Sequence, residues 1–299
     1  MKRILIAGAN GLLGQTLVKT FEARSKVLAT GIEEKPHLTP VTWEYLPLDI
    51  TKMEDCKKLF QEFVPEIVIN AASYTHVDDC EKNRELCWKV NVKAVENLGH
   101  LARRYDAHLI HYSTDYIFDG TEGPYGEDET PNPLGYYGKS KLASENVLHQ
   151  IAPSFTILRT CVLYGTGYGV KKNFFLWVNE NLRKGNKINV VTDQYNNPTL
   201  AEDLAIGTRL VIEESAQGVY HMAGKNYINR YDFALAIADV FNLRNDLIAP
   251  IHSEQLQQQA NRPPRGGLKI DLAGRDLGYT PRSVNDSLIY LKWKMERNG

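Results

Sequence analysis

The sequence lacks several features that mark other classes of protein. It has only four cysteines, with no CxxC pair and none at a metal-ligand spacing from a histidine, which argues against a disulfide framework and a zinc site. No segment approaches the ~18 apolar residues of a membrane-spanning helix. The apolar start is broken by glycine, asparagine and glutamine before a cleavable signal could form. We therefore expect a cytoplasmic protein with no membrane partner.

An excess of charge of either sign is also absent. Lysine and arginine number 35 against 36 aspartate and glutamate residues, which leaves a formal net charge of −1. Because binding to nucleic acid relies on a basic surface, we expect no nucleic-acid partner. The chain also has no internal repeat and no low-complexity tract, so its composition is that of an ordinary globular protein.

What the first half does contain is a regular alternation of short β-branched segments and longer helical patterns. This alternation is typical of βαβ units with a parallel sheet. We expect strands over residues 3–7, 26–30, 42–48, 66–72, 108–114 and 155–159, and helices over 12–23, 52–63 and 84–105. The expected fold class is α/β, a doubly wound parallel (Rossmann) sheet with a smaller C-terminal substrate lobe.

The alternation weakens after about Cys161. We therefore expect residues 1–160 to form a dinucleotide-binding domain and residues 161–299 to form mainly a substrate-binding lobe. Two strand-like segments of the second half, KINVVTD at 187–193 and GVYHMAG at 218–224, are candidates to return to the main sheet.

A glycine-rich turn follows the first expected strand and opens the first helix. In that position a pyrophosphate can meet backbone N–H groups at the helix N-terminus. A strand-to-helix turn that binds no ligand is the alternative. The cofactor contacts expected from this turn are Gly8, Asn10, Gly11, Leu12, Leu13 and Gly14.

An acidic residue about twenty positions beyond such a turn usually binds the ribose hydroxyls of NAD. Glu33 or Glu34 lies near that spacing, but Lys35 beside them would tolerate the extra phosphate of NADP, so the choice between NAD and NADP stays open. Solvated loop charges are the alternative. Asp49 and Ile50, at the end of the third strand, are placed to meet the adenine ring, or else to cap the next helix.

Tyr137 and Lys141 stand four residues apart, which places both on one face of a helix. A nearby cation favours the ionised form of a phenol, so we expect Lys141 to lower the pKa of Tyr137 and to make it a general acid near neutral pH. The neighbouring Tyr136 has Ser140 four residues on and is excluded from this role.

Two further residues complete the expected catalytic set. Thr114 ends the fifth strand, at the carboxyl edge where doubly wound sheets bind ligands, and can donate a hydrogen bond to a substrate carbonyl. A strand-end cap is the alternative for Thr114, and a turn residue for Asp115. Asn91, inside an expected helix, could hold a water or a backbone carbonyl beneath Tyr137, or could simply be satisfied by its neighbours.

In order and spacing, several segments resemble the extended short-chain dehydrogenases, and within them the dTDP-4-dehydrorhamnose reductase family. The GxxGxxG spacing of the turn is the form seen in short-chain dehydrogenases, and the resemblance covers almost the whole chain. It is carried by AGANGLLG, the D-I-T at Asp49, INAASYTHVDDCE, HYSTDYIFDG, PYGEDETPNPLGYYGKSKLASE, ILRTCVLYG, the DQYNNPT at Asp193, and ANRPPRGGL.

The resemblance implies an NADPH- or NADH-dependent reduction of the 4-keto group of a dTDP-6-deoxy sugar, and a possible homodimer. It implies that Thr114, Tyr137 and Lys141 are catalytic, with Lys141 also holding the cofactor ribose. It also implies that the nicotinamide side of the cofactor cleft is lined by Ala71, Ala72, Ser73 and Tyr74. As substrate contacts we expect Thr75, Val77, Asp115, Asn173, Gln194 with the segment to Thr199, and Arg262 for the diphosphate.

The chain also departs from the family pattern. Val162 stands where many members carry a tryptophan against the sugar, and Gly266-Gly267 replaces a polar or small pair, which leaves the exact sugar nucleotide open. Some members use Mg²⁺ at a dimer contact built from acidic residues, but no carboxylate cluster here can be assigned to it, so no metal ligand is named and the requirement for Mg²⁺ stays open.

Two rival functions remain. A bifunctional epimerase-reductase similar to GDP-fucose synthase would need a cysteine beside the catalytic hydroxyl, and Ser113-Thr114-Asp115 lacks one. A non-catalytic subunit similar to the regulatory β subunit of methionine adenosyltransferase is the other rival, although Tyr137 and Lys141 favour catalysis.

Overall fold

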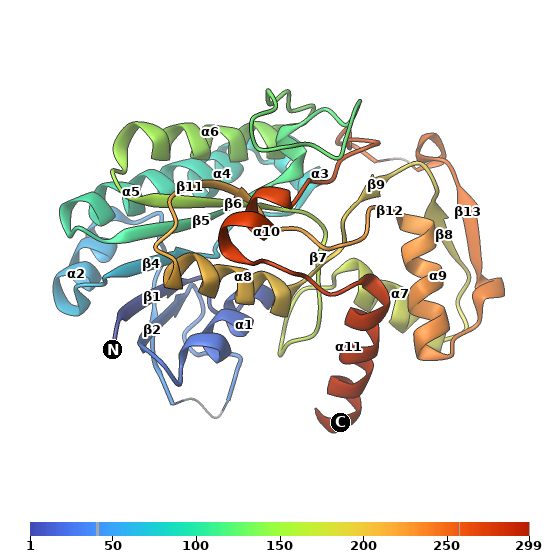
Figure 1. The fold of residues 1–299 in the computed structure, drawn as a ribbon, viewed down its shortest axis with the longest axis horizontal. Helices are drawn as coiled ribbons and strands as arrows, with labels where there is room; N and C mark the ends of the chain where they lie inside the picture. Colours follow the sequence, from blue (N-terminus) through green and yellow to red (C-terminus); the bar gives the residue numbers. More distant parts are fainter. Residues whose placement is uncertain (40–41, 257, 299) are drawn as a thin grey trace.

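The computed structural model describes residues 1–39, 42–256 and 258–298. A seven-stranded sheet in the order β11-β6-β5-β4-β1-β2-β3 occupies its larger part (Figure 1). Each neighbouring pair is parallel. The strands are β1 Arg3–Ala7, β2 Lys26–Gly31, β3 Glu44–Pro47, β4 Ile67–Asn70, β5 His108–Thr114, β6 Phe155–Thr160 and β11 Gly218–His221. The expected doubly wound sheet is thus confirmed, and its order reverses between β1 and β4, where such sheets bind ligands.

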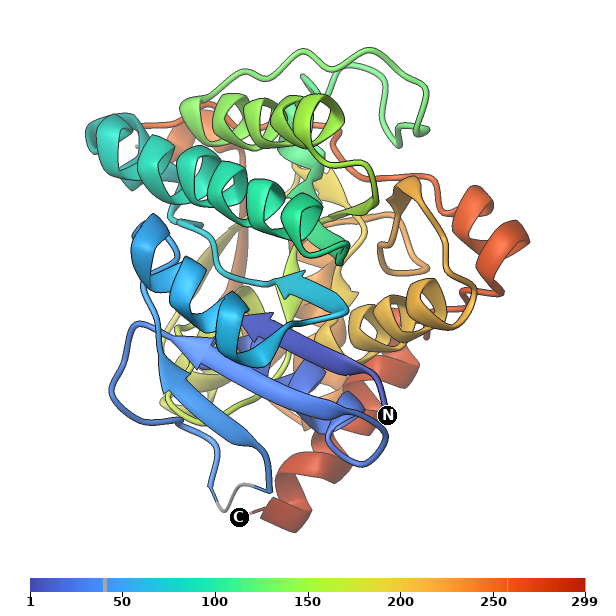
Figure 2. The same cartoon turned by 90° about the vertical axis from the view of Figure 1, so that its left-hand side faces the viewer.

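Helices cover both faces of this sheet because its strands are apolar on both sides. One face carries α2 (Met53–Phe63), α5 (Ala94–Arg104) and α6 (Tyr136–Ile151), the blue, teal and green helices of Figure 2. The other carries α1 (Leu12–Phe21), α8 (Ala201–Glu213) and α10 (Asp271–Leu277). Side chains such as Leu5 and Ile6, adjacent on β1, are fully buried toward opposite faces, as the period of two in a strand requires.

The single helix expected over 84–105 is built from several pieces. A short α3 (Val77–Lys82) precedes α4 (Arg84–Trp88), which continues through a π-helical turn, η1 (Lys89–Lys93), into α5. A π-turn inserts an extra residue into a helix and is often found at functional sites. Asn91 lies in this turn.

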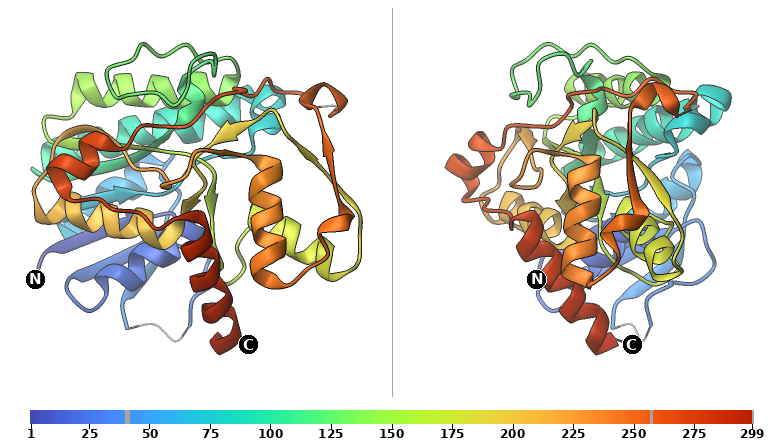
Figure 3. Two further views of the ribbon diagram at one scale, coloured as in Figure 1. Left: turned by 45° about the vertical axis from the view of Figure 1, so that its right-hand side comes forward. Right: turned by 90° about the vertical axis from the view of Figure 1, so that its right-hand side faces the viewer.

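A second apolar core lies to the right of the sheet in Figure 1 and is seen from two further sides in Figure 3. It is formed by α7 (Phe174–Arg183), α9 (Arg230–Phe241) and α11 (Val284–Asn298), around side chains such as Phe175 and Phe233. Strands β8 (Ile188–Val191) and β13 (Ile248–Ile251) pair in parallel beside α9. The remaining elements are β7 Leu163–Tyr164 with β10 Thr199–Leu200, β9 Tyr195–Asn196 with β12 Ile228–Asn229, and the 3₁₀ turns η2 Asp115–Ile117, η3 Asn245–Leu247 and η4 Ser253–Gln255.

The two candidate returning segments behave differently. Residues 218–221 do join the main sheet, as β11 beside β6. The segment at 188–191 does not, and the idea that it returns is wrong: Ile188 and Val190 are buried in the second core, where β8 pairs with β13. Within the ranges described, no helix is both long and apolar enough to cross a membrane.

Candidate active site

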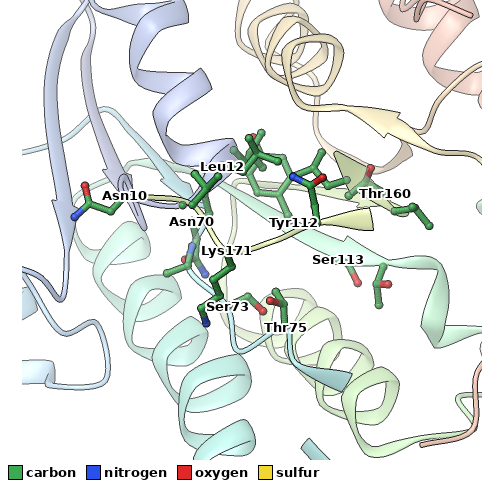
Figure 4. Close-up of a pocket in the computed structure, with 18 of the residues that line it drawn as sticks. Asn10, Leu12, Asn70, Ser73, Thr75, Tyr112, Ser113, Thr160 and Lys171 are labelled. Carbon is green, nitrogen blue, oxygen red and sulfur yellow. The ribbon is translucent and has the colours of Figure 1, made fainter. Parts of the chain in front are cut away.

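A cavity of about 480 Å³ opens at the carboxyl ends of β1, β4 and β5. Figure 4 shows Asn10 at one end, Ser113 and Thr160 at the other, and Leu12, Asn70 and Lys171 between them. Residues far apart in sequence meet here because parallel strands end at the same edge of the sheet. The expected site residues that line it are Asn10, Gly11, Leu12, Leu13, Glu33, Ala71, Ala72, Ser73, Thr75, Thr114, Tyr137, Lys141 and Asn173.

The glycine turn forms one end of the cavity. Gly8 has a φ of +81°, and a Cβ there would lie 2.6 Å from the backbone nitrogen of Ala72. A Cβ on Gly14 would collide with the carbonyl oxygen of Gly8, so these two glycines allow helix α1 to pack closely on β1. Gly11 caps α1 and has no side chain to occupy the first-turn N–H groups. Those groups therefore remain available, which fits the turn to a pyrophosphate.

Replacing Gly14 by alanine is expected to destabilise the protein by about 3 kcal/mol, because the added methyl meets backbone that cannot rotate away. Binding of the dinucleotide should be lost with the turn. The matched control is Gly274→Ala in α10, where the nearest atom to a new Cβ is 3.7 Å away and alanine favours the helix. Urea unfolding of both variants measures the free energy of unfolding. An equal change in the two variants, relative to the wild type, would contradict the prediction.

Glu33 stands at the cavity just beyond β2, whereas Glu34 does not line it. Oε2 of Glu33 accepts a 3.0 Å hydrogen bond from Asn10 Nδ2. Oδ1 of Asn10 in turn accepts from the backbone N–H of His37 at 2.9 Å. A carboxylate held in this way can accept from ribose hydroxyls. Lys35 is exposed and contributes its backbone carbonyl to Asn10 rather than a charge to the cavity wall.

Asp49 and Ile50 lie outside the cavity lining. The carboxylate of Asp49 accepts from the backbone N–H and the hydroxyl of Thr51, at 3.0 and 2.7 Å, in a turn that precedes α2. Ile50 is buried in the core beneath α2 and α5. Asp49 therefore closes a local turn. It does not provide the helix cap that was the alternative, because the N-cap of α2 is Lys52 and no side chain caps that helix.

The three residues expected to be catalytic converge on one wall. Tyr137 and Lys141 lie one turn apart on α6, and Thr114 is the last residue of β5. All three line the same cavity, and the hydroxyl of Thr114 acts on the phenol of Tyr137 by lowering its pKa. Tyr136 points elsewhere, with its ring 5.2 Å from the guanidinium of Arg84. The helix therefore selects Tyr137 over its neighbour.

The protonation of this pair differs from the sequence-based expectation. Burial raises the pKa of Tyr137 above its ordinary value, and the hydrogen bond from Thr114 opposes only part of that effect. Lys141 is not among the main influences on the phenol; burial lowers the pKa of Lys141 itself to about 8, against the attraction of Glu145. Near neutral pH the phenol thus keeps its proton, as a general acid must.

Asn91 is buried and acts on the backbone beneath the site. Its Oδ1 accepts from Tyr74 N–H at 2.7 Å and from Ser73 Oγ at 2.9 Å, and its Nδ2 donates to Tyr74 O at 3.1 Å and Ser140 Oγ at 3.0 Å. Ser140 Oγ in turn donates to the carbonyl oxygen of Tyr137 at 2.7 Å. Asn91 therefore joins the Ser73–Tyr74 loop to the helix that carries Tyr137, and contacts no atom of the phenol in these bonds.

Four of the expected substrate contacts lie outside this cavity: Val77, Asp115, Gln194 and Arg262. Arg262 is engaged by Asp78 at 2.7 and 3.1 Å, and Gln194 Nε2 donates to Ser253 Oγ at 2.9 Å. The side chains of Arg262 and Gln194 are thus engaged in contacts that hold loops of the second lobe. Asn173 does line the cavity, but its Oδ1 also caps α7 by accepting from Leu176 N–H at 3.1 Å.

Asp115 is buried directly behind Thr114. Its Oδ2 accepts from Gly267 N–H at 3.2 Å and its Oδ1 from the hydroxyl of Thr114, also at 3.2 Å. Burial raises the pKa of Asp115 to about 6, while Arg230 opposes this. Gly266-Gly267 permits the contact, because a Cβ on Gly266 would lie 2.7 Å from Asp115 Oδ2. Asp115 therefore holds the hydroxyl of Thr114.

The sequence analysis missed several residues, among them Asn70 and Lys171, which line the cavity, and His111 and Ser140, which contact Lys141 and Asn91 behind it. His111 and Asn70 interrupt apolar strands with buried polar side chains, which is the one signal that could have found them. In the described ranges no group of three His, Cys, Asp or Glu side chains forms a metal site.

Comparison of the sequence with known proteins identifies the family of this chain. The family model described as the RmlD substrate binding domain matches residues 1–296. The chain belongs to this family, the dTDP-4-dehydrorhamnose reductases. It is 36% identical to the dTDP-4-dehydrorhamnose reductase of Aggregatibacter actinomycetemcomitans, over 80% of the chain and 79% of the relative. The resemblance inferred from the motifs is thus confirmed.

Two other relatives bear on function. The solved dTDP-4-dehydrorhamnose reductase of Bacillus anthracis, in complex with NADP, superposes with a TM-score of 0.85 at 29% identity, over 98% of this chain and all of that one. The methionine adenosyltransferase 2 subunit beta of Xenopus laevis is 34% identical over 85% of this chain and 76% of the relative. The family therefore includes both reductases and a subunit of another enzyme.

Proposed function

We propose that this protein reduces the 4-keto group of a dTDP-6-deoxy-4-keto-hexose, converting dTDP-4-dehydrorhamnose to dTDP-L-rhamnose. The observation that supports this best is the convergence of Thr114, Tyr137 and Lys141 on the cavity that the glycine turn also lines. To reduce a ketone, an enzyme needs a hydride donor at the carbonyl carbon and a proton donor at the carbonyl oxygen. This arrangement offers a dinucleotide site and a protonated phenol side by side.

The residues present fit a nicotinamide dinucleotide, as the NADP complex of the Bacillus anthracis relative suggests. The N–H groups at the start of α1 would hold the pyrophosphate, Glu33 the adenosine ribose, and Lys141 the nicotinamide ribose. When bound, the reduced cofactor supplies the hydride. Because Glu33 presents a carboxylate to the cavity, we expect NADH to be accepted, with NADPH weakened by repulsion of its phosphate.

The chain's own residues would handle the oxygen of the keto group. The hydroxyl of Thr114 donates to Asp115 Oδ1 at 3.2 Å, and on binding of the ketone it would turn from that carboxylate to donate to the carbonyl oxygen and orient it. Tyr137 gives its phenolic proton to that oxygen as it gains negative charge, and Lys141, one helical turn further along α6, lines the same cavity. No carboxylate is assigned to Mg²⁺ in this scheme.

The deciding experiment measures oxidation of NADH and of NADPH with a panel of keto-sugar nucleotides that differ in base and sugar. Turnover of dTDP-4-dehydrorhamnose above the GDP- and UDP-linked ketones supports the proposal. Absence of turnover with every ketone, in a protein that still binds the dinucleotide, contradicts it.

A second candidate is a non-catalytic subunit, which the relation to methionine adenosyltransferase 2 subunit beta favours. The Xenopus relative is almost as similar as the reductase of Aggregatibacter actinomycetemcomitans, at 34% against 36% identity. This candidate predicts dinucleotide binding with no keto-sugar reduction. It also predicts stable co-purification with a methionine adenosyltransferase catalytic subunit, which size-exclusion chromatography of the mixture would detect.

The pKa of Lys141 predicts a pH dependence of the reduction. The active form carries the ammonium, which is present below about pH 8 and is lost as the pH rises through that value. We therefore expect kcat/KM to fall on the alkaline side of about pH 8, and Lys141→Met to be inactive at every pH. The exposed neighbour Lys139 provides the control, since Lys139→Met should keep the wild-type profile. A flat alkaline profile would count against the role of Lys141.

A further inference from the structure

His111 is a buried residue of β5 that touches the catalytic lysine. Its ring is 1% exposed, and its Nε2 lies 3.1 Å from Lys141 Nζ and 3.0 Å from Ser144 Oγ. On the other side of the ring, Nδ1 lies 3.2 Å from Asn70 Nδ2. Strands β4 and β5 and helix α6 thus meet at this one imidazole, directly behind the catalytic wall.

The surrounding hydrogen bonds assign the proton of the ring. Asn70 Oδ1 accepts from the backbone N–H of Ala72 at 3.2 Å, so Asn70 Nδ2 faces His111 and donates to Nδ1. Burial and the nearby Lys141 hold the pKa of His111 well below its ordinary value, so the ring is neutral. A neutral ring that accepts at Nδ1 carries its single proton on Nε2.

The Nε2–H group therefore points toward Ser144 and Lys141. The hydroxyl of Ser144 donates to the carbonyl oxygen of Lys141 at 2.6 Å, which leaves its oxygen free to accept from the ring. The nitrogen of Lys141 can accept from the same N–H only as a neutral amine, because an ammonium has no lone pair. His111 is thus a partner for the deprotonated form of Lys141 and a poor one for the charged form.

The other groups that act on Lys141 do not offer this contact. Glu145, one turn further along α6, favours the ammonium, as does Cys87 from α4. Tyr137 lies one turn before it on α6. In the parts of the chain that the structure describes, no carboxylate forms an ion pair with Lys141, and Glu145 is engaged instead by Arg159 at 2.7 Å.

We infer that His111 is a positioning residue that receives Lys141 as a neutral amine during turnover, an inference that rests on the proposed reduction. Tyr137 loses its phenolic proton to the sugar oxygen, and in this inference the proton that restores the phenol is drawn from the Lys141 ammonium, one helical turn away on α6. The neutral amine then accepts the Nε2–H bond of His111 until a proton from solvent restores the ammonium. One hydride from the cofactor and one solvent proton are consumed for each ketone reduced.

Two amide variants separate the two sides of the ring. The amide of His111→Gln reaches the position of Nε2 and keeps an N–H donor for Lys141, whereas that of His111→Asn reaches only Nδ1 and keeps the contact with Asn70. Loss of the donor removes stabilisation from the neutral amine, so the pKa of Lys141 should rise in His111→Asn. We expect its alkaline limit of kcat/KM to move up by about one pH unit and kcat to fall about tenfold, the effect of one hydrogen bond. His111→Gln should stay near wild type, and cofactor binding should be unchanged in both.

A profile for His111→Asn that matches the wild type, or equal shifts in both variants, would overturn the inference. Nuclear magnetic resonance of protein labelled with ¹⁵N-histidine tests the contact without any substrate. We expect the His111 ring to be the neutral Nε2–H form at neutral pH, and Lys141→Met to shift its Nε2 resonance. An Nδ1–H ring or an imidazolium would overturn the inference. If the His111 ring is in the neutral Nε2–H form but the protein reduces no ketone, the contact with Lys141 is supported. In that case only the proposed function is contradicted.

Discussion

Tyr137→Phe is expected to lower kcat for the keto-sugar nucleotide by about 10² to 10⁴-fold, the contribution of a positioned general acid. The change removes only the hydroxyl and leaves the ring packed against Tyr116 at 5.8 Å between centroids. The variant should therefore fold and bind the dinucleotide as the wild type does. Stopped-flow measurement of cofactor oxidation, with fluorescence titration of cofactor binding, checks both halves of this prediction.

Tyr136→Phe is the matched control, since Tyr136 is the adjacent residue of the same helix and does not line the cavity. Its turnover should remain within about twofold of the wild type, because no reacting atom is touched. If Tyr137→Phe kept a rate close to that of Tyr136→Phe, the phenol would not be the proton donor.

Glu145→Ala is expected to reduce the free energy of unfolding by about 3–5 kcal/mol, the usual cost of leaving one partner of a buried ion pair alone. Glu145 and Arg159 are 2% and 6% exposed, and three hydrogen bonds of 2.7, 3.1 and 3.2 Å join them. The pair connects helix α6 to strand β6, and so supports the helix that carries Tyr137 and Lys141.

A surface pair of the same chemistry provides the comparison. Arg209 and Glu213 form an ion pair on the exposed side of α8, so Glu213→Ala should cost less than about 1 kcal/mol. Urea unfolding monitored by circular dichroism measures both variants. Similar losses at the two sites would show that burial of the Glu145 pair has no special consequence for stability.

Much of the candidate site was predictable because its signals are local. The spacing of Tyr137 and Lys141 follows from helix geometry alone, and the glycine turn follows from where a strand must give way to a helix. Thr114 was predictable because a strand ends there, and all parallel strands of such a sheet end at the ligand-binding edge. These features depend on residues close in the chain.

Other assignments failed because they depend on contacts between distant segments. Arg262, expected at a diphosphate, is engaged by Asp78 across 184 positions of the chain. Asp49 is an exception to this reason, since it closes a local turn with Thr51, two residues on, and lies outside the cavity lining. Residues 188–191 pair with β13, since Ile188 and Val190 find a second apolar core that their own pattern cannot distinguish from the first.

The order of strands and helices, the dinucleotide turn and the Tyr137–Lys141 pair were determined by the sequence itself, because periodicity and turn chemistry act over a few residues. The state of charge of that pair was decided only by the tertiary structure. Burial, not the lysine, dominates the pKa of Tyr137, and the lysine faces His111 on a neighbouring strand. Desolvation and long-range hydrogen bonds exist only once the sheet and its helices have come together.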